Sequence, residues 1–230
     1  MIKLGEMQIV AGGRAKTYAL LAALFSAPPS EELAAMIRKG GLAPEGGGPL
    51  KQAAEALTTA FRLLEPAGPA AADVIAEYTR LFSLPSGVVP HESYYADKNQ
   101  RVGGHVTAAV KLYYDNAAAQ LTGACLELPD HIGVELEFMQ FLCDIEKQFW
   151  DGPDGDGLQR CLDFQNGFLF EHLLCWHREL CEKILNETGL EIYRALATLT
   201  LEFLEAERVF VPELAQAIQS EWRTPCTSES

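Results

Sequence analysis

The chain has 230 residues, 48% of them hydrophobic, which predicts a folded protein with one sizeable core and excludes a disordered chain. Its 18 Lys and Arg residues against 32 Asp and Glu give a net charge of −14, which disfavours nucleic acid and anionic membranes as partners and favours a cationic one. The apolar run at residues 18–25 is too short to cross a membrane, and no signal-peptide cleavage site follows it. None of the six cysteines forms a CxxC pair, so we expect a cytoplasmic protein without a membrane span, in a reducing compartment.

Hydrophobic residues recur at helical spacing along nearly the whole chain, and strand-like alternation is scarce. The sequence therefore predicts an all-α fold, arranged as a helical bundle or a globin-like packing of helices. The predicted helices, in chain order, cover residues 14–25, 31–39, 49–64, a segment through 74–82, 106–121, 132–149, 158–185, 191–210 and 213–222. Glycine and proline clusters separate several of these helices, at residues 40–49, 66–69, 83–93 and 151–157.

Local signals set several helix ends. Ser30 is a predicted N-cap, and Gly40 follows the end of the same helix. Gly167 is a candidate break inside the helix at 158–185, and Pro212 is predicted to end the helix that begins at residue 191. The polar residues after Trp222 are predicted to form a disordered tail.

The segment 151–157 is acidic and rich in glycine, like a calcium-binding loop. An EF-hand loop needs a bidentate acid at its twelfth position, which here is Leu162, so we reject a calcium site. The segment is predicted to be a hinge between residues 1–150 and residues 151–230. Because such hinges permit exchange of segments between copies, both a monomer and a domain-swapped dimer are open.

Asp130 and His131 precede the strongest amphipathic helix. We predict that Asp130 caps this helix and stays ionised, and that His131 lies in its first turn and stays neutral beside the positive helix end. A neutral histidine can exchange hydrogen bonds with a bound peptide. The alternative, favoured on the residues alone, is a plain helix cap.

Residues 85–95 combine a rigid proline turn with polar and aromatic side chains, among them Pro90, Glu92, Ser93 and Tyr94. This composition suits peptide docking. An ordinary loop whose tyrosines fill the core is the alternative, and composition alone favours it.

Four candidate metal ligands lie on one predicted helix, at His172, Cys175, His177 and Cys181. They do not share a face, because His177 points about 160° away from Cys175, so we expect a buried helix face and no metal. No hydrolase, dinucleotide, Walker or zinc-protease motif occurs, and we expect no cofactor and no enzymatic activity.

Several segments together resemble one known family. They are EYTRLF at 77–82, PHESYY at 90–95, PDHIGVELEFM at 129–139, FEHLLCW at 170–176 and YRALA at 193–197. In order and spacing the chain resembles the TorD/DmsD/NarJ family of redox enzyme maturation chaperones over residues 18–207.

The resemblance implies an all-α bundle in which residues 1–150 carry a leader-binding groove and residues 151–230 end in the disordered tail. It implies a cytoplasmic chaperone for the catalytic subunit of a molybdopterin oxidoreductase, with the twin-arginine leader peptide of that subunit as ligand. The family's groove positions match Tyr78, Leu81, Phe82, Pro90, Glu92, Ser93, Asp130 and His131, and the loop composition adds Tyr94 as a peptide-binding candidate. Some members have Trp at the position of Tyr78, which bears on leader preference.

Other functions remain open. NarJ-type members bind a nitrate reductase with a remnant leader, so the client need not be exported. An enzyme would use His131 as base with Asp130 or Glu92 orienting it. The family is associated with weak guanine nucleotide binding, although no phosphate loop is visible here. A structural subunit that uses its apolar grooves for assembly is the remaining alternative.

Overall fold

The computed structural model describes residues 4–40, 48–64, 69–119, 127–152 and 154–222. These residues are predominantly helical and include no strand, so the predicted all-α class is confirmed. The helices are α1 (Leu4–Ser26), α2 (Glu31–Lys39), α3 (Pro49–Arg62), α4 (Pro69–Tyr78), α5 (Glu92–Ala96), α6 (His105–Asn116), α7 (Ile132–Phe149), α8 (Gly155–Phe168), α9 (Leu174–Glu187) and α10 (Glu191–Trp222). Two π-helical turns extend α4 and join α8 to α9, at Thr79–Ser83 and Leu169–Leu173.

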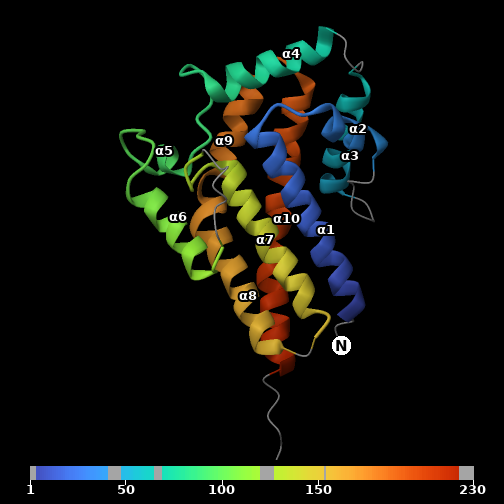
Figure 1. The fold of residues 1–230 in the computed structure, drawn as a ribbon, viewed down its shortest axis with the longest axis vertical. Helices are drawn as coiled ribbons and strands as arrows, with labels where there is room; N and C mark the ends of the chain where they lie inside the picture. Colours follow the sequence, from blue (N-terminus) through green and yellow to red (C-terminus); the bar gives the residue numbers. More distant parts are fainter. Residues whose placement is uncertain (1–3, 41–47, 65–68, 120–126, 153, 223–230) are drawn as a thin grey trace, which may run out of the picture.

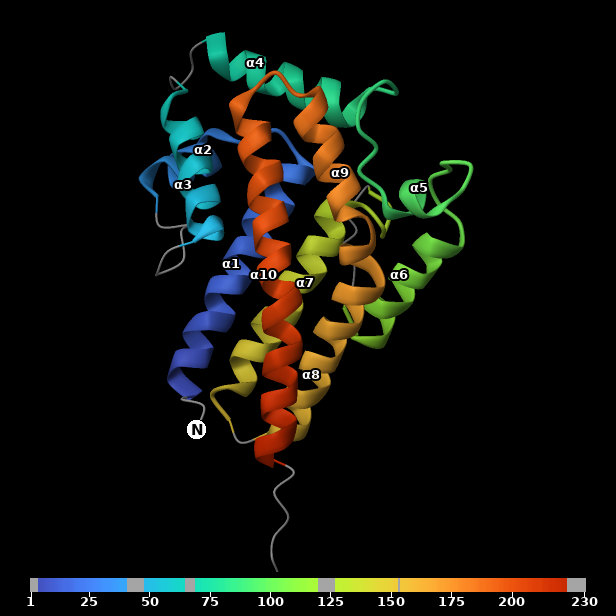
Figure 2. The same ribbon diagram turned by 180° about the vertical axis from the view of Figure 1, so that it is seen from behind.

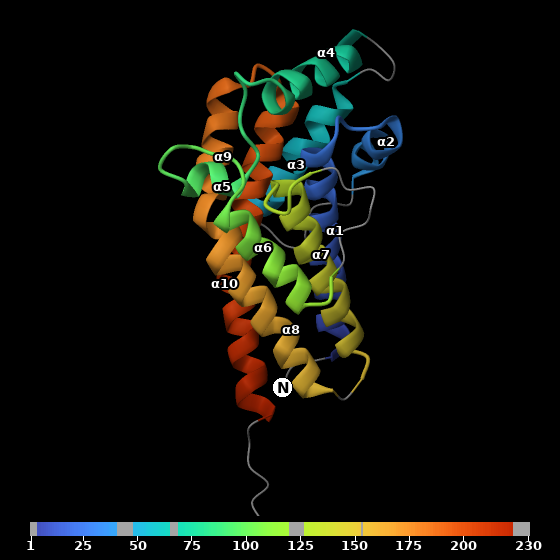
Figure 3. The same ribbon diagram turned by 60° about the vertical axis from the view of Figure 1, so that its left-hand side comes forward.

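Long helices run side by side to form an elongated bundle (Figure 1). Helix α1 packs along α7, and α10 contacts α3, α8 and α9 as it runs the length of the molecule (Figure 2). Helix α4 crosses one end of the bundle, and α5 and α6 lie together on one side (Figure 3). None of the helices in the described ranges combines the length and hydropathy that a membrane crossing requires.

Several predicted helix ends are confirmed. Ser30 accepts a hydrogen bond from the Leu33 amide as the N-cap of α2, and Gly40 follows that helix with a φ of 81°. Helix α3 opens at Pro49, as expected for a proline in the first turn. Most of the predicted loops at 40–49 and 66–69, and the predicted disordered tail, lie outside the described residues.

Other helix ends differ from the prediction. Helix α1 begins ten residues earlier than expected, at Leu4, and its added turns place Ala11 against the buried Trp150 cluster. Pro212 lies inside α10 and does not end it. A proline inside a helix costs about 3 kcal/mol, and the buried contacts of the following turns, at Leu214 and Ile218, offset that cost.

The predicted hinge segment is shorter than expected. Asp154 accepts a hydrogen bond from the Gly157 amide at 2.8 Å, so α8 begins at Gly155. The break expected near Gly167 is the π-helical turn just after it. The division into residues 1–150 and residues 151–230, and exchange across this segment, stay predictions.

The described core contains a large apolar cluster, a small one and a buried polar layer. Arg14 of α1 donates to both Glu207 oxygens, at 2.8 and 2.7 Å, to Glu146 at 2.5 Å and to Gln165 at 2.6 Å. Tyr18 donates to Glu207, and Trp150 donates to Glu146. Every charged group in the layer thus has partners, which is the condition for burying charge without a large loss of stability.

We predict that Arg14→Met lowers the free energy of unfolding by about 3–5 kcal/mol, because it leaves two buried carboxylates without their cation. Lys16→Met, on the exposed side of the same helix, is the control and should change stability little. Urea unfolding followed by circular dichroism measures both. Equal effects of the two substitutions would show that the layer contributes nothing specific.

Candidate functional site

Two of the segments that carry the family resemblance, residues 90–95 and 129–139, lie next to each other in the structure. The amide of Glu92 donates to the carbonyl of Asp130, and the amide of Ile132 donates to the carbonyl of Pro90, both at 2.9 Å. These bonds pair His91 with His131 as an isolated antiparallel bridge. The bridge ties the start of α5 to the start of α7.

Asp130 caps α5 and not α7. Its fully buried carboxylate accepts from the Ser93 amide at 3.0 Å and from the Thr107 hydroxyl at 2.8 Å. The predicted capping of α7 by Asp130 is therefore wrong. The bridge turns the Asp130 side chain toward α5 and α6 and leaves the N-cap position of α7 to the next residue.

His131 is that N-cap: its Nδ1 accepts from the Gly133 amide at 3.0 Å. Only a neutral ring has a lone pair for this bond. Burial, with a further contribution from His91, lowers the pKa of His131 to about 3 against the opposing pull of Asp130. The predicted neutral form is confirmed, although burial is the main cause and the predicted position in the first turn was off by one residue.

Behind α5 lies a buried acidic cluster. Glu92 is 2.8 Å from His172 Nδ1, and Glu135 accepts from the Trp176 indole N–H at 3.2 Å. Burial, followed by the nearby Glu92 carboxylate, raises the pKa of Glu135 well above its usual range. Glu135 therefore keeps its proton at pH values where an exposed glutamate is ionised.

Helix α5 is held from several sides, and its two tyrosines lie partly exposed beside this support. The Ser93 hydroxyl accepts from the Gly103 amide at 2.8 Å, where Gly103 takes a φ of 98°. Tyr94 and Tyr95 remain half-buried, and the Tyr95 ring packs on Trp176 with centroids 5.3 Å apart. The buried groups thus fix the position of partly exposed aromatic rings.

The three candidates from the EYTRLF segment form a separate group. Tyr78 donates to the carbonyl of Phe25 at 2.9 Å, Leu81 is fully buried, and the Phe82 ring packs on Tyr78 at 5.2 Å. Burial, followed by the charge of Glu127, raises the pKa of Tyr78 to about 12.

The loop after this segment joins the two groups. The Val88 amide donates to the carbonyl of Leu81 at 2.6 Å, and Gly87 passes so close that a Cβ there would collide with the same carbonyl. Glycine is therefore required at this close approach.

The structure brings six of the nine candidates together and places three apart. Only Phe82 and Tyr94 keep half-exposed side chains. The buried candidates are Tyr78, Leu81, Pro90, Glu92, Ser93, Asp130 and His131. In this conformation the buried side chains position their neighbours, and direct peptide contact by any of the nine stays a prediction.

The candidate metal ligands do not converge. His172 bonds Glu92, whereas His177 contacts the carbonyl of Leu173 at 3.0 Å. Cys175 is exposed and Cys181 is buried. No group of three potential ligands assembles within the described ranges.

Sequence reasoning gave no role to Glu135, Trp176 or Lys183 of this region, and it considered His172 only as a candidate metal ligand. His172 and Trp176 lie one helical turn apart in the FEHLLCW segment, and that spacing was the available signal. Lys183 carries no such signal, because nothing local distinguishes it from other lysines on a polar helix face.

We predict that Glu135→Gln becomes stabilising relative to the wild type as the pH rises. A raised folded-state pKa gives a contribution that is full below the unfolded value of about 4.3 and is lost as the pH rises through the folded pKa. The uncharged amide removes that loss, by about 1.4 kcal/mol per unit of pKa displacement. Urea unfolding between pH 4 and 8 measures it, with Asp144→Asn on the exposed face of α7 as control. Parallel curves for Glu135→Gln and the wild type would contradict the prediction.

Comparison with known proteins adds family membership to this geometry. A family model described as nitrate reductase delta subunit matches residues 43–182. The chaperone protein TorD of Vibrio cholerae serotype O1 strain M66-2 is 25% identical over 220 residues, which cover 92% of this chain and 97% of the relative. The TorD proteins of strains ATCC 39315 and ATCC 39541 are 25% and 24% identical with the same coverage.

Among solved structures, a crystal structure of an Archaeoglobus fulgidus protein, provisionally named a redox enzyme maturation protein, superposes with a TM-score of 0.51 at 20% identity. It covers 84% of this chain and 93% of that chain, and it supports the fold alone. The family match spans more than half of the chain and includes α5, α7 and the bridge between them. The chain therefore belongs to the nitrate reductase delta subunit family, and it is similar to TorD chaperones over nearly its whole length.

Proposed function

We propose that this protein is a chaperone that binds the twin-arginine leader, or N-terminal segment, of the catalytic subunit of a molybdopterin oxidoreductase and assists maturation before export or assembly. The observation that carries the proposal is the junction of α5 and α7, where two of the family-resembling segments meet beside half-exposed aromatic rings. Such rings supply large contact area around a buried, hydrogen-bonded support.

The charge of the chain also fits this ligand. A twin-arginine leader carries arginines followed by an apolar, helix-prone run. A net charge of −14 speeds the approach of the cationic part. Each large apolar side chain that a groove buries contributes about 1.5–3 kcal/mol before the costs of binding, so a few anchors reach the micromolar range.

An apolar pocket is available for the second part of such a ligand. It has a volume of about 200 Å³ and lies where α3, α4 and α10 meet. Its lining includes Leu64, Val74 and Ile192, with the acidic Asp73 and Glu191 beside them. A cationic and apolar peptide matches both features of the lining.

The same proposal implies a cellular compartment and a kind of client. Leader recognition takes place in the cytoplasm, before the client is exported, and a cytoplasmic client of the nitrate reductase kind fits equally. The relatives are named chaperones, so we propose no catalytic step. Tight guanine nucleotide binding is not part of the proposal, and the choice between a monomer and a domain-swapped dimer stays open to measurement in solution.

We predict that Asp130→Ala weakens binding of a molybdoenzyme leader peptide at least tenfold, because it removes the cap that fixes α5. Asp154→Ala is the control: it removes the side-chain cap of another helix, α8, and should leave the affinity unchanged. Loss of the exposed Asp154 cap costs about 1 kcal/mol of stability. Asp130→Ala costs more, because Asp130 is buried and accepts two hydrogen bonds. Calorimetric titration at low and moderate salt measures binding, and circular dichroism checks the fold.

Equal losses of affinity in the two variants would show that leader binding does not depend on α5. If Asp130→Ala fails to fold, Thr107→Val serves as the milder test, because it removes only one of the two bonds to the Asp130 carboxylate. No saturable binding of any leader by the folded wild type would overturn the proposed function.

A further inference from the structure

A lysine of α9 lies over both tyrosines of α5. The Lys183 ammonium is 4.5 Å from the centre of the Tyr95 ring and 5.0 Å from that of Tyr94. The two rings meet edge to face, with centroids 5.2 Å apart and planes at 79°. Both distances fall within the roughly 6 Å range of a cation–π contact, so the rings form an aromatic corner that holds a cation.

Acidic groups surround this corner. Glu179, one turn before Lys183 on α9, lies 3.1 Å from the ammonium. Burial raises the pKa of Tyr95, and the charges of Glu179 and Glu187 raise it further, so both carboxylates act electrostatically on that ring. The corner therefore combines aromatic faces with negative charge, which together favour a cation.

Lys183 makes no hydrogen bond to the Tyr95 hydroxyl. The hydroxyl oxygen is buried and has no hydrogen-bond partner among the described residues. An unmatched buried hydroxyl is costly, which points to a ligand group that would satisfy it. An ammonium is a compact, strongly hydrated point charge, whereas a guanidinium is planar, stacks on aromatic faces and offers five donors in a fork.

The aromatic corner is already formed without a ligand. Tyr95 packs on Trp176, whose indole N–H donates to Glu135. Ser93, the residue before Tyr94, is held by Asp130. Preformed geometry reduces the ordering cost of binding.

We propose that Tyr94, Tyr95 and Glu179 form a seat for an arginine side chain of the peptide ligand, and that Lys183 fills this seat until the ligand displaces it. This inference rests on the proposed function, because the ligand is the leader's arginine region. Displacement costs little: Lys183 and Glu179 are 32% and 58% exposed, and ion pairs this exposed contribute little to stability. The freed ammonium regains its hydration.

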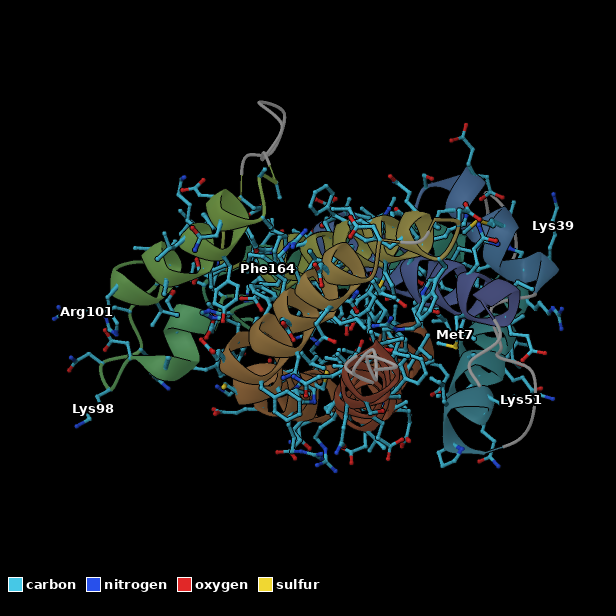
Figure 4. All side chains as sticks on the ribbon, turned by 90° about the horizontal axis from the view of Figure 1, so that it is seen from below. Met7, Lys39, Lys51, Lys98, Arg101 and Phe164 are labelled. Atoms are coloured by element: carbon cyan, nitrogen blue, oxygen red, sulfur yellow. The ribbon has the colours of Figure 1, made fainter. Side chains whose placement is uncertain are left out.

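The first test uses Lys183→Met, which removes the internal competitor. We expect it to raise the affinity for a twin-arginine leader about three- to tenfold in calorimetric titration. Lys51→Met is the matched control, since Lys51 also pairs with a glutamate four residues away, Glu55, and changes the net charge equally. Lys51 lies on the side of the molecule opposite Lys98 and Arg101 of the loop after α5 (Figure 4).

The second test removes the seat or the ligand group. Glu179→Gln and Tyr94→Leu should each weaken binding about three- to tenfold. A leader with both arginines replaced by glutamine should bind wild type and Lys183→Met equally. Leader binding that is unchanged or weakened by Lys183→Met, or a gain that persists with the glutamine peptide, overturns the seat and leaves the proposed function standing.

If no leader binds at all, the proposed function is overturned. A separate measurement then tests whether the arginine seat exists. Acetyl-arginine amide is titrated into Lys183→Met while the tyrosine ring resonances are followed by nuclear magnetic resonance. Saturable shifts of the ring resonances that are absent from the double variant Lys183→Met, Tyr94→Leu support the seat. Absence of such shifts overturns it.

Discussion

The guanidinium of Arg14 fixes the register of four helices, and the rest of the bundle depends on that register. It donates to Glu207 of α10, Glu146 of α7 and Gln165 of α8. Apolar helix faces can slide past one another at modest cost, because hydrophobic contacts have no direction. Charged hydrogen bonds in a buried layer have both direction and a large penalty for breaking, so one relative position of α1, α7, α8 and α10 is strongly preferred. That position brings the start of α7 to the loop before α5.

The candidate site repeats this arrangement on a smaller scale. Buried polar groups hold a short element, α5, that five residues of helix would not stabilise alone. Asp130 and the bridge at His91 fix its start, and Glu92 bonds His172 behind it. The residues that resemble the family motifs are thus mostly buried, and their effect on a ligand passes through the rings that they position. Substitution of a buried residue and substitution of an exposed ring therefore test different steps of recognition.

Sequence patterns predicted the helices where apolar spacing is regular, as at residues 132–149, and where Ser30 or Pro49 marks an end. They failed where long-range contacts decide. The helix continues through Pro212 because its next turns are buried, and Asp130 caps α5 because the bridge turns it there. The site was predicted as a set of residues through resemblance, yet which of them face solvent depends on tertiary packing. Lys183 reaches its position only through the packing of α5 on α9, which no local pattern encodes.

An internal cation in the ligand seat also bears on how a chaperone releases its client. When a competing group fills a site for most of the time, the apparent dissociation constant rises in proportion to the reduced fraction of free sites. Lys183 is covalently attached, so its effective concentration at the two rings does not fall as the client is diluted or exported. It can reoccupy the corner as soon as an arginine leaves, which opposes rebinding without weakening the apolar contacts that recognise the rest of the leader. Selectivity and release are then controlled by different regions of the same surface.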